Sequence, residues 1–182
     1  MIKKRCFIAF NLSKKVKDKI FNWSKNYRKK FINAKWVDKE NLHITDHFLG
    51  YLEKAKIEKV GEVLKNIKKP DNIKIKVKKI DCFPKKERTR VLFLKVMERN
   101  NLLENLHKRV ERALVSKIDY KPSKKIWVPH ITLARFKKPK KITLDYFNDF
   151  NGEDLIESID LMESKLSPKG PKYFILKKYQ FN

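Results

Sequence analysis

Two short segments of the chain carry the same three residues, a histidine, an isoleucine and a threonine. They are His43-Ile44-Thr45 and His130-Ile131-Thr132, and a Trp-Val pair precedes each of them. The chain has four histidines and four threonines, so two unrelated histidines would share this spacing with a probability of about 0.003. Nearly half of the 182 residues separate the two segments, which indicates an internal duplication.

The residue types in these segments are suited to acid–base chemistry on a phosphodiester. Residues two apart in a strand face the same side, so we expect His43 and Thr45 to project together while Ile44 enters the core. The second segment would do the same, and two facing strands would place two imidazoles and two hydroxyls around one cleft. Imidazole titrates near neutrality, so one ring can donate a proton while the other accepts one. The threonine hydroxyls can donate to phosphate oxygens.

The histidines have two other interpretations. A single histidine is more often a structural residue of a strand, but the repeated pair favours a cleft. A metal held by His43 and His47 is excluded on a strand, because four residues span about 13 Å. Cys6 and Cys82 lack the spacing of metal ligands. We therefore expect no metal site and no metal cofactor.

The surrounding sequence predicts an α+β fold. Apolar runs and alternation predict strands over 6–12, 35–37, 42–49, 73–77, 90–97, 126–136, 156–166 and 173–179. Apolar residues at helical spacing predict helices over 16–27, 57–67 and 103–114. The order strand, helix, strand, helix, strand occurs twice. We expect a bilobal, pseudo-two-fold arrangement in which antiparallel sheets from two lobes line a central cleft and helices pack outside.

The predicted lobes belong to one domain over 1–182. They cover roughly 1–80 and 90–182, and an exchange of strands between them is left open. Hydrophobic residues make up 41% of the chain, which is enough for a folded core.

The charge balance favours a polyanionic partner. Lysine and arginine number 46 against 21 acidic residues, a formal net charge of +25. A lysine-rich solvated surface is the alternative. The unpaired cysteines indicate a reduced, cytoplasmic protein. Because no apolar run reaches the length of a membrane span, we expect no membrane partner. A monomer is the expected state.

In this order the segments resemble the two-histidine phosphoesterases, specifically the RNA 2′,3′-cyclic phosphodiesterase branch, also named 2′-5′ RNA ligase. The resemblance covers nearly the whole chain. It is carried by Phe7-Ile8-Ala9-Phe10, Trp36-Val37, Asn41 to Thr45, Phe48-Leu49-Gly50, Arg90 to Phe93, Val128 to Arg135, and the pattern Ser164-x-Leu166-x-Pro168-x-Gly170-Pro171-x-Tyr173.

The resemblance implies a role for each motif residue. His43 would be the proton donor and His130 the proton acceptor, while Thr45 and Thr132 would bind the phosphate. The implied reaction opens a ribose 2′,3′-cyclic phosphate at an RNA end to a 2′-phosphate, and the reverse reaction would join RNA ends through a 2′-5′ bond. No cofactor is implied. The alternatives are a non-catalytic RNA-binding module of the same fold and a two-histidine enzyme that acts on small cyclic phosphates.

The first motif departs from the family pattern, which usually reads His-Ile-Thr-Leu-Lys-Phe-Leu-Gly. Asp46 occupies an apolar position that should face inward, so it needs a partner or a twist that exposes it. His47 shares the strand face of His43, which makes it a candidate substrate contact at the rim of the cleft, or equally a solvated surface residue. Arg135 is a second candidate contact, although a regular strand would turn it away from the site, and ion pairing is its alternative role.

Overall fold

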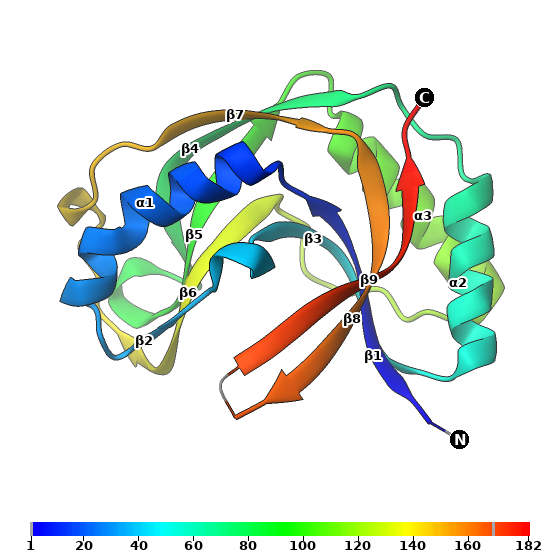
Figure 1. The fold of residues 1–182 in the computed structure, drawn as a ribbon, viewed down its shortest axis with the longest axis horizontal. Helices are drawn as coiled ribbons and strands as arrows, with labels where there is room; N and C mark the ends of the chain where they lie inside the picture. The colour runs from blue at the N-terminus through cyan, green and yellow to red at the C-terminus, as the bar shows by residue number, and fades with distance from the viewer. Residues whose placement is uncertain (1, 169) are drawn as a thin grey trace.

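The computed structural model describes residues 2–168 and 170–182, and within them one curved antiparallel sheet dominates the fold (Figure 1). Its strands are β1 (Lys4–Asn11), β2 (Ala34–Trp36), β3 (His43–Leu52), β4 (Ile73–Phe83), β5 (Thr89–Glu98), β6 (His130–Lys140), β7 (Asn151–Ile156), β8 (Ser158–Ser167) and β9 (Gly170–Gln180). The strand order is β7-β4-β5-β6-β3-β1-β8-β9, with β2 paired to β6 beside this path. The predicted α+β class with antiparallel strands is confirmed.

The sheet has two arms that meet where β6 pairs with β3. One arm holds β7, β4, β5 and β6, and the other holds β3, β1, β8 and β9. Each arm contains strands from both halves of the sequence, because β4 joins β5 while β8 and β9 join β1. The two motif strands, β3 and β6, therefore lie side by side at the centre of the sheet.

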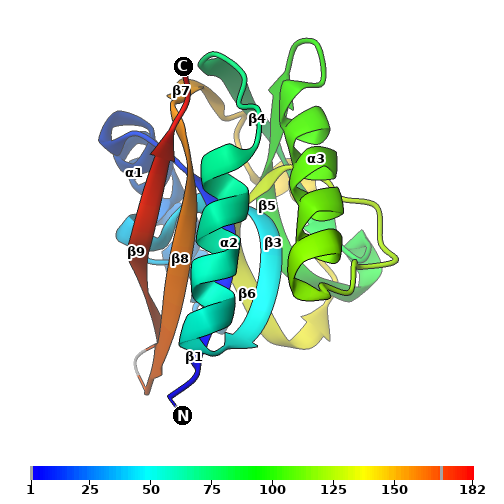
Figure 2. The same ribbon diagram turned by 90° about the vertical axis from the view of Figure 1, so that its right-hand side faces the viewer.

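Helices α1 (Lys14–Lys30), α2 (Lys54–Asn66) and α3 (Leu102–Ile118) cover the sheet. Ser13 caps α1 by accepting a hydrogen bond from the Val16 N–H, and Val16 and Ile20 bury one face of this helix. Helix α1 packs near β7, whereas α2 and α3 lie side by side and pack on the other arm (Figure 2). Short 3-10 helices occur at η1 (Lys39–Asn41), η2 (Lys86–Arg88) and η3 (Leu144–Tyr146).

Two predicted strands differ from the observed ones. The strand expected over 126–136 begins only at His130 and continues to Lys140. The strand expected over 156–166 is preceded by a separate strand, β7, and the two are divided at Glu157, whose carbonyl instead accepts a hydrogen bond from the Phe181 N–H. Every α-helix among the described residues is too short or too polar to cross a membrane.

A β-bulge follows each histidine motif at the same place. In β3, two consecutive residues of β1 pair with Thr45 and His47, so Asp46 is an extra residue. In β6, Leu133 is an extra residue opposite β5 in the same way. A bulge adds one residue to a strand and so reverses the alternation of faces beyond it. Residues after each bulge therefore face the opposite side from the one a regular strand predicts.

The core lies between the sheet and the helices. Ile44 and Ile131 are fully buried in it, as the alternation predicts, and they pair with each other across the junction of the two arms. The largest fully buried side chains come from both arms and from the helices: Phe10, Phe93, Ile8, Ile20, Leu42, Leu64, Ile73, Ile75, Leu92, Leu94 and Leu103. This shared core fixes the motif strands relative to each other.

Candidate active site

The pairing of Ile44 with Ile131 brings the two motifs together. In an antiparallel pair, residues on either side of a paired position lie across from each other in reverse order. His43 therefore lies across from Thr132, and Thr45 lies across from His130. The cleft face of the junction carries two imidazoles and two hydroxyls, related by a local two-fold axis through the isoleucine pair.

A pocket of about 460 Å³ opens at this junction. Four predicted site residues line it: His43, Thr45, Thr132 and Arg135. His130 is not among the lining residues, but it lies close enough for its charge to act on His43. The structure thus brings together both histidines, both threonines and the arginine.

Both imidazole rings are oriented by the same backbone contact. The His43 Nδ1 donates to the carbonyl oxygen of Asn41, and the His130 Nδ1 donates to that of Val128, each at 2.7 Å. A carbonyl oxygen cannot donate, so the proton of each neutral ring is on Nδ1 and the lone pair is on Nε2. The Nε2 of His43 accepts a hydrogen bond from the Thr45 hydroxyl at 2.8 Å. Both rings therefore keep Nε2 for proton transfer.

Both histidines are neutral at neutral pH in the free protein. Burial lowers the pKa of His43 to about 4, and the positive charges of Lys17 and Arg135, and of His130 when it is protonated, act in the same direction, while the Asn41 carbonyl opposes them. Burial and Arg135 also lower the pKa of His130 against the Val128 carbonyl.

Aromatic side chains partly bury both rings. The His43 ring lies 5.1 Å from the Phe7 ring and 5.2 Å from the Tyr173 ring. The His130 ring lies 5.2 Å from the Phe83 ring and 5.1 Å from the Phe93 ring. Each imidazole is therefore held in a partly apolar shell that disfavours its charged form.

Two arginines give the pocket a positive charge. Arg135 lines the pocket because the bulge at Leu133 reverses the strand alternation, so the regular strand that would turn it away does not form. Arg5 lines the pocket from β1 and donates through Nη1 to the Ser164 hydroxyl at 3.1 Å. These guanidinium groups suit the pocket to an anion such as a phosphate.

The expectation that His47 lies at the cleft rim or on the surface is wrong. Its side chain is 1% exposed and it does not line the pocket, because the bulge at Asp46 turns it to the opposite face of the sheet. Phe48 takes the place next to the pocket instead, with 62% of its surface exposed.

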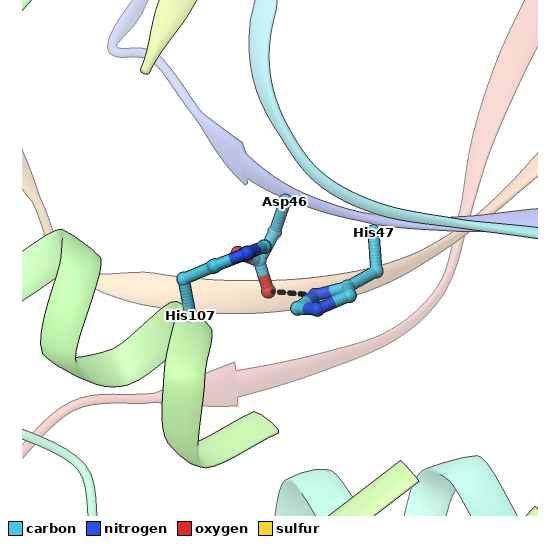
Figure 3. A group of neighbouring side chains, drawn as sticks. All are labelled: Asp46, His47 and His107. Atoms are coloured by element: carbon cyan, nitrogen blue, oxygen red, sulfur yellow. Dashed lines mark hydrogen bonds and ion pairs between the residues drawn. The ribbon is translucent and has the colours of Figure 1, made fainter. Parts of the chain in front are cut away.

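Asp46 has the partners that its inward position requires. One carboxylate oxygen accepts from the His47 Nδ1 and the other from the His107 Nδ1, both at 2.8 Å (Figure 3). Burial alone would raise the pKa of Asp46, but the hydrogen bonds from His107 and His47 outweigh it and hold the pKa below its usual value. His107 comes from α3, 61 residues further along the chain, so no local pattern in the sequence indicates this contact.

These three side chains are also the group among the described residues whose potential ligand atoms converge, within 4.8 Å of one another. Two histidines and one carboxylate are a donor set that transition metals use. Here, however, both Nδ1 atoms already donate to the carboxylate, and the two rings stack 4.2 Å apart. The arrangement is that of a hydrogen-bonded cluster on the far side of β3 from the pocket.

Several pocket residues have no role predicted from the sequence. Arg5 and Phe48 are not among the predicted site residues, and Ser164 and Tyr173 belong only to a C-terminal pattern. The position of Arg5 could have been predicted from the sequence, because Arg5 precedes Phe7 by two residues on β1 and so lies on the same face of the strand. Ser164 and Tyr173 come from β8 and β9, whose place beside β1 only the fold reveals.

Comparison with known proteins agrees with this geometry. The family model described as "LigT like Phosphoesterase" matches residues 11–93. The chain is 34% identical over 181 residues to the RNA 2′,3′-cyclic phosphodiesterase of Aquifex aeolicus, covering 96% of each protein. It is also 34% identical over 181 residues to that of Methanocaldococcus jannaschii, covering 96% of this chain and 99% of the relative.

A solved structure shares the fold. The structure of E. coli LigT complexed with 3′-AMP superposes with a TM-score of 0.83 at 21% identity, covering 99% of each chain. This likeness shows the fold, and the sequence relatives over nearly the full length show the family. The chain belongs to the LigT-like phosphoesterase family.

Proposed function

We propose that the protein hydrolyses 2′,3′-cyclic phosphate ends of RNA to 2′-phosphates, using His43 and His130 as its acid–base pair. The observation that carries the proposal is the pair of imidazoles, each with Nδ1 tied to a backbone carbonyl, beside a pocket lined by two arginines. The names of the full-length relatives support the RNA substrate, and so does the net charge of +25.

The two histidines divide the proton transfers. His130 is neutral, so its Nε2 takes a proton from the attacking water while the water oxygen bonds to phosphorus. The bond between phosphorus and the ribose 3′-oxygen then breaks, and His43 protonates that oxygen. The product carries a 2′-phosphate and a free 3′-hydroxyl. If the 5′-hydroxyl of a second RNA attacks the cyclic phosphate in place of water, the same bond to the 3′-oxygen breaks and a 2′-5′ bond joins the two ends, which is the proposed ligation.

His43 must gain a proton before it can act as the acid, because its pKa of about 4 leaves it neutral in the free protein. A bound phosphate anion favours the charged imidazolium and raises this pKa. The Thr45 hydroxyl, which donates to Nε2 in the free protein, would then turn to a phosphate oxygen. Thr132, Arg5 and Arg135 complete the contacts to the anion.

The proposed mechanism needs no metal. Among the described residues that line the pocket none is a carboxylate, whereas two are arginines that can neutralise the charge developing on phosphate. The proton transfers are assigned to imidazoles. Activity is therefore expected to survive treatment with EDTA and to require no ATP.

One assay tests the proposal. The protein is incubated with an RNA oligonucleotide that ends in a 2′,3′-cyclic phosphate, with and without EDTA, beside a His130→Ala control. The expected product is the 2′-phosphate, formed equally in EDTA and not by the control. Release of a 3′-phosphate, or activity that EDTA removes and zinc or manganese restores, would contradict the mechanism. If the protein bound the RNA without any turnover, it would be a non-catalytic RNA-binding module.

A further inference from the structure

We propose that Asp46, His47, His107 and Trp127 form a positioning network that holds both histidine motifs in register from behind the pocket. The inference rests on the proposed function, since the residues that it positions are those of the proposed reaction. None of the four lines the pocket, so they act through other groups rather than on the substrate.

The buried carboxylate of Asp46 ties strand β3 to helix α3. Its side chain is fully buried, and each of its oxygens accepts one imidazole Nδ1–H (Figure 3). A buried carboxylate is costly unless it is paired, so the position of the His107 ring is coupled to that of Asp46. Asp46 is itself the bulge residue that directly follows Thr45.

Three planar rings then stack in a column. The His47 and His107 rings lie 4.2 Å apart with an interplanar angle of 15°, and the His107 and Trp127 rings lie 4.4 Å apart at 7°. Trp127 is thereby held flat against His107, and its indole Nε1 donates to the Thr45 carbonyl oxygen at 3.0 Å. The column therefore starts at His47, two residues after Thr45, and ends at Trp127, which is bonded to Thr45 itself.

The same tryptophan anchors the segment that leads into the second motif. Residues 126–129 form no helix or strand, and the neighbouring Ile126 is 92% exposed. Val128, directly after Trp127, supplies the carbonyl that orients the His130 ring. Two contacts hold this segment to the rest of the fold: the Val96 N–H donates to the Pro129 carbonyl at 3.3 Å, and Trp127 donates to the Thr45 carbonyl. One column therefore holds the Thr45 backbone and the carbonyl that orients His130.

The other arm of the sheet argues against a merely structural role. At the equivalent bulge of β6 the residues are Leu133 and Ala134, and both are buried. The fold thus accepts an apolar bulge at this position. Of these two bulges, the first carries the buried carboxylate with its two imidazoles, and it is there that Trp127, from the segment before His130, donates to the Thr45 carbonyl.

Two substitutions separate the contacts of the network. His107→Phe keeps a ring between His47 and Trp127 but removes the hydrogen bond to Asp46. Trp127→Phe keeps the stacking but removes the donor to the Thr45 carbonyl. His107→Asn restores a donor near the Nδ1 position and should recover part of the loss. The matched control is Val60→Ala, a buried residue of α2 that perturbs packing away from the network.

The readouts are kcat and KM for a cyclic-phosphate RNA, and the tautomer of His130 from the ¹⁵N shifts of its ring. Both phenylalanine variants should lower kcat by about 10- to 100-fold through misplacement of the catalytic groups, with KM nearly unchanged. His130 should lose its single Nδ1–H tautomer. The control should melt at a lower temperature but keep kcat and the tautomer.

The outcomes distinguish this inference from the proposed function. An unaltered protein that fails to open cyclic phosphates refutes the proposed function, while the His130 tautomer still tests the network. An active protein whose phenylalanine variants keep kcat and the tautomer refutes the network alone. An activity or melting temperature that zinc raises in the unaltered protein but not in His107→Phe would also overturn it, because the cluster would then be a metal site.

Discussion

The two halves of the pocket repeat one design with different surroundings. In each half a histidine is tied through Nδ1 to the carbonyl two residues earlier, a threonine follows on the same face, and a bulge comes next. The first bulge places Asp46 inside the fold and turns Phe48 toward the pocket. The second places Leu133 inside and turns Arg135 toward the pocket.

Identical motifs therefore have different electrostatic surroundings in the two halves. His43 is enclosed by Phe7 and Tyr173, lies near the charges of Lys17 and Arg135, and has a pKa of about 4. The pKa of His130 is also lowered, but by fewer neighbouring charges. Both shifts favour the neutral imidazole in the free protein, so in the proposed mechanism the bound phosphate must favour protonation of one ring.

The largest expected effect comes from removing either imidazole. His43→Ala and His130→Ala should each lower kcat for a cyclic-phosphate RNA by at least about 10²-fold, since a positioned acid or base contributes at least that much. The double variant should be little worse than either single variant, because the two act in one step. Melting temperatures serve as the control for folding. A single variant that keeps near-normal turnover would remove that histidine from the mechanism.

Substitution of the two threonines should show a difference between the two halves of the pocket. Thr45→Val and Thr132→Val should each lower kcat by about 10²-fold, as loss of a donor to developing charge does. Only Thr45 donates to a histidine Nε2 among the described residues, so Thr45→Val should also raise the pKa of His43 above about 4. NMR titration of His43 in both variants checks this. An equal rise in Thr132→Val would contradict the asymmetry.

The pH dependence of kcat/KM tests which state each histidine has in the free protein. The protonated fraction of His43 falls above about pH 4, and His130 becomes neutral already below pH 6.5, its ordinary pKa. The profile of kcat/KM against pH should therefore be bell-shaped, with both its rising and its falling limb below pH 6.5. The profile of kcat should extend to higher pH, because the bound phosphate raises the pKa of His43. A kcat/KM that is still rising above pH 7 would contradict the assignment.

The smallest expected effect is that of salt on kcat/KM for a mononucleotide substrate, compared with an oligonucleotide. If the charge of +25 holds RNA, kcat/KM for an oligonucleotide should fall with salt, with a log–log slope of about −0.7 per phosphate contacted. A mononucleotide 2′,3′-cyclic phosphate has only the reacting phosphate and should be much less sensitive. Equal weak dependence for both would mean that the lysines are a solvated surface and that the natural substrate is a small cyclic phosphate.

Local sequence patterns were sufficient to predict the class of fold and the side chains that meet where its two arms join. The repeat of His-Ile-Thr identified both imidazoles and both hydroxyls, because strand alternation places histidine and threonine on one face and isoleucine in the core. Ile44 and Ile131 are fully buried as that pattern requires. Apolar periodicity located the three helices within a few residues. These are local properties of the chain, and they need no knowledge of distant partners.

The direction of the side chains beyond each motif depends instead on tertiary packing. A single extra residue at Asp46 and at Leu133 reverses the alternation, which buries His47 and brings Arg135 to the pocket against the regular pattern. A bulge is set by how two strands pair, so neither strand predicts it alone. One of the two partners of Asp46 is His107, on a helix that sequence patterns could not place beside β3. The types of the proposed catalytic residues are local information, whereas their partners depend on how distant segments pack.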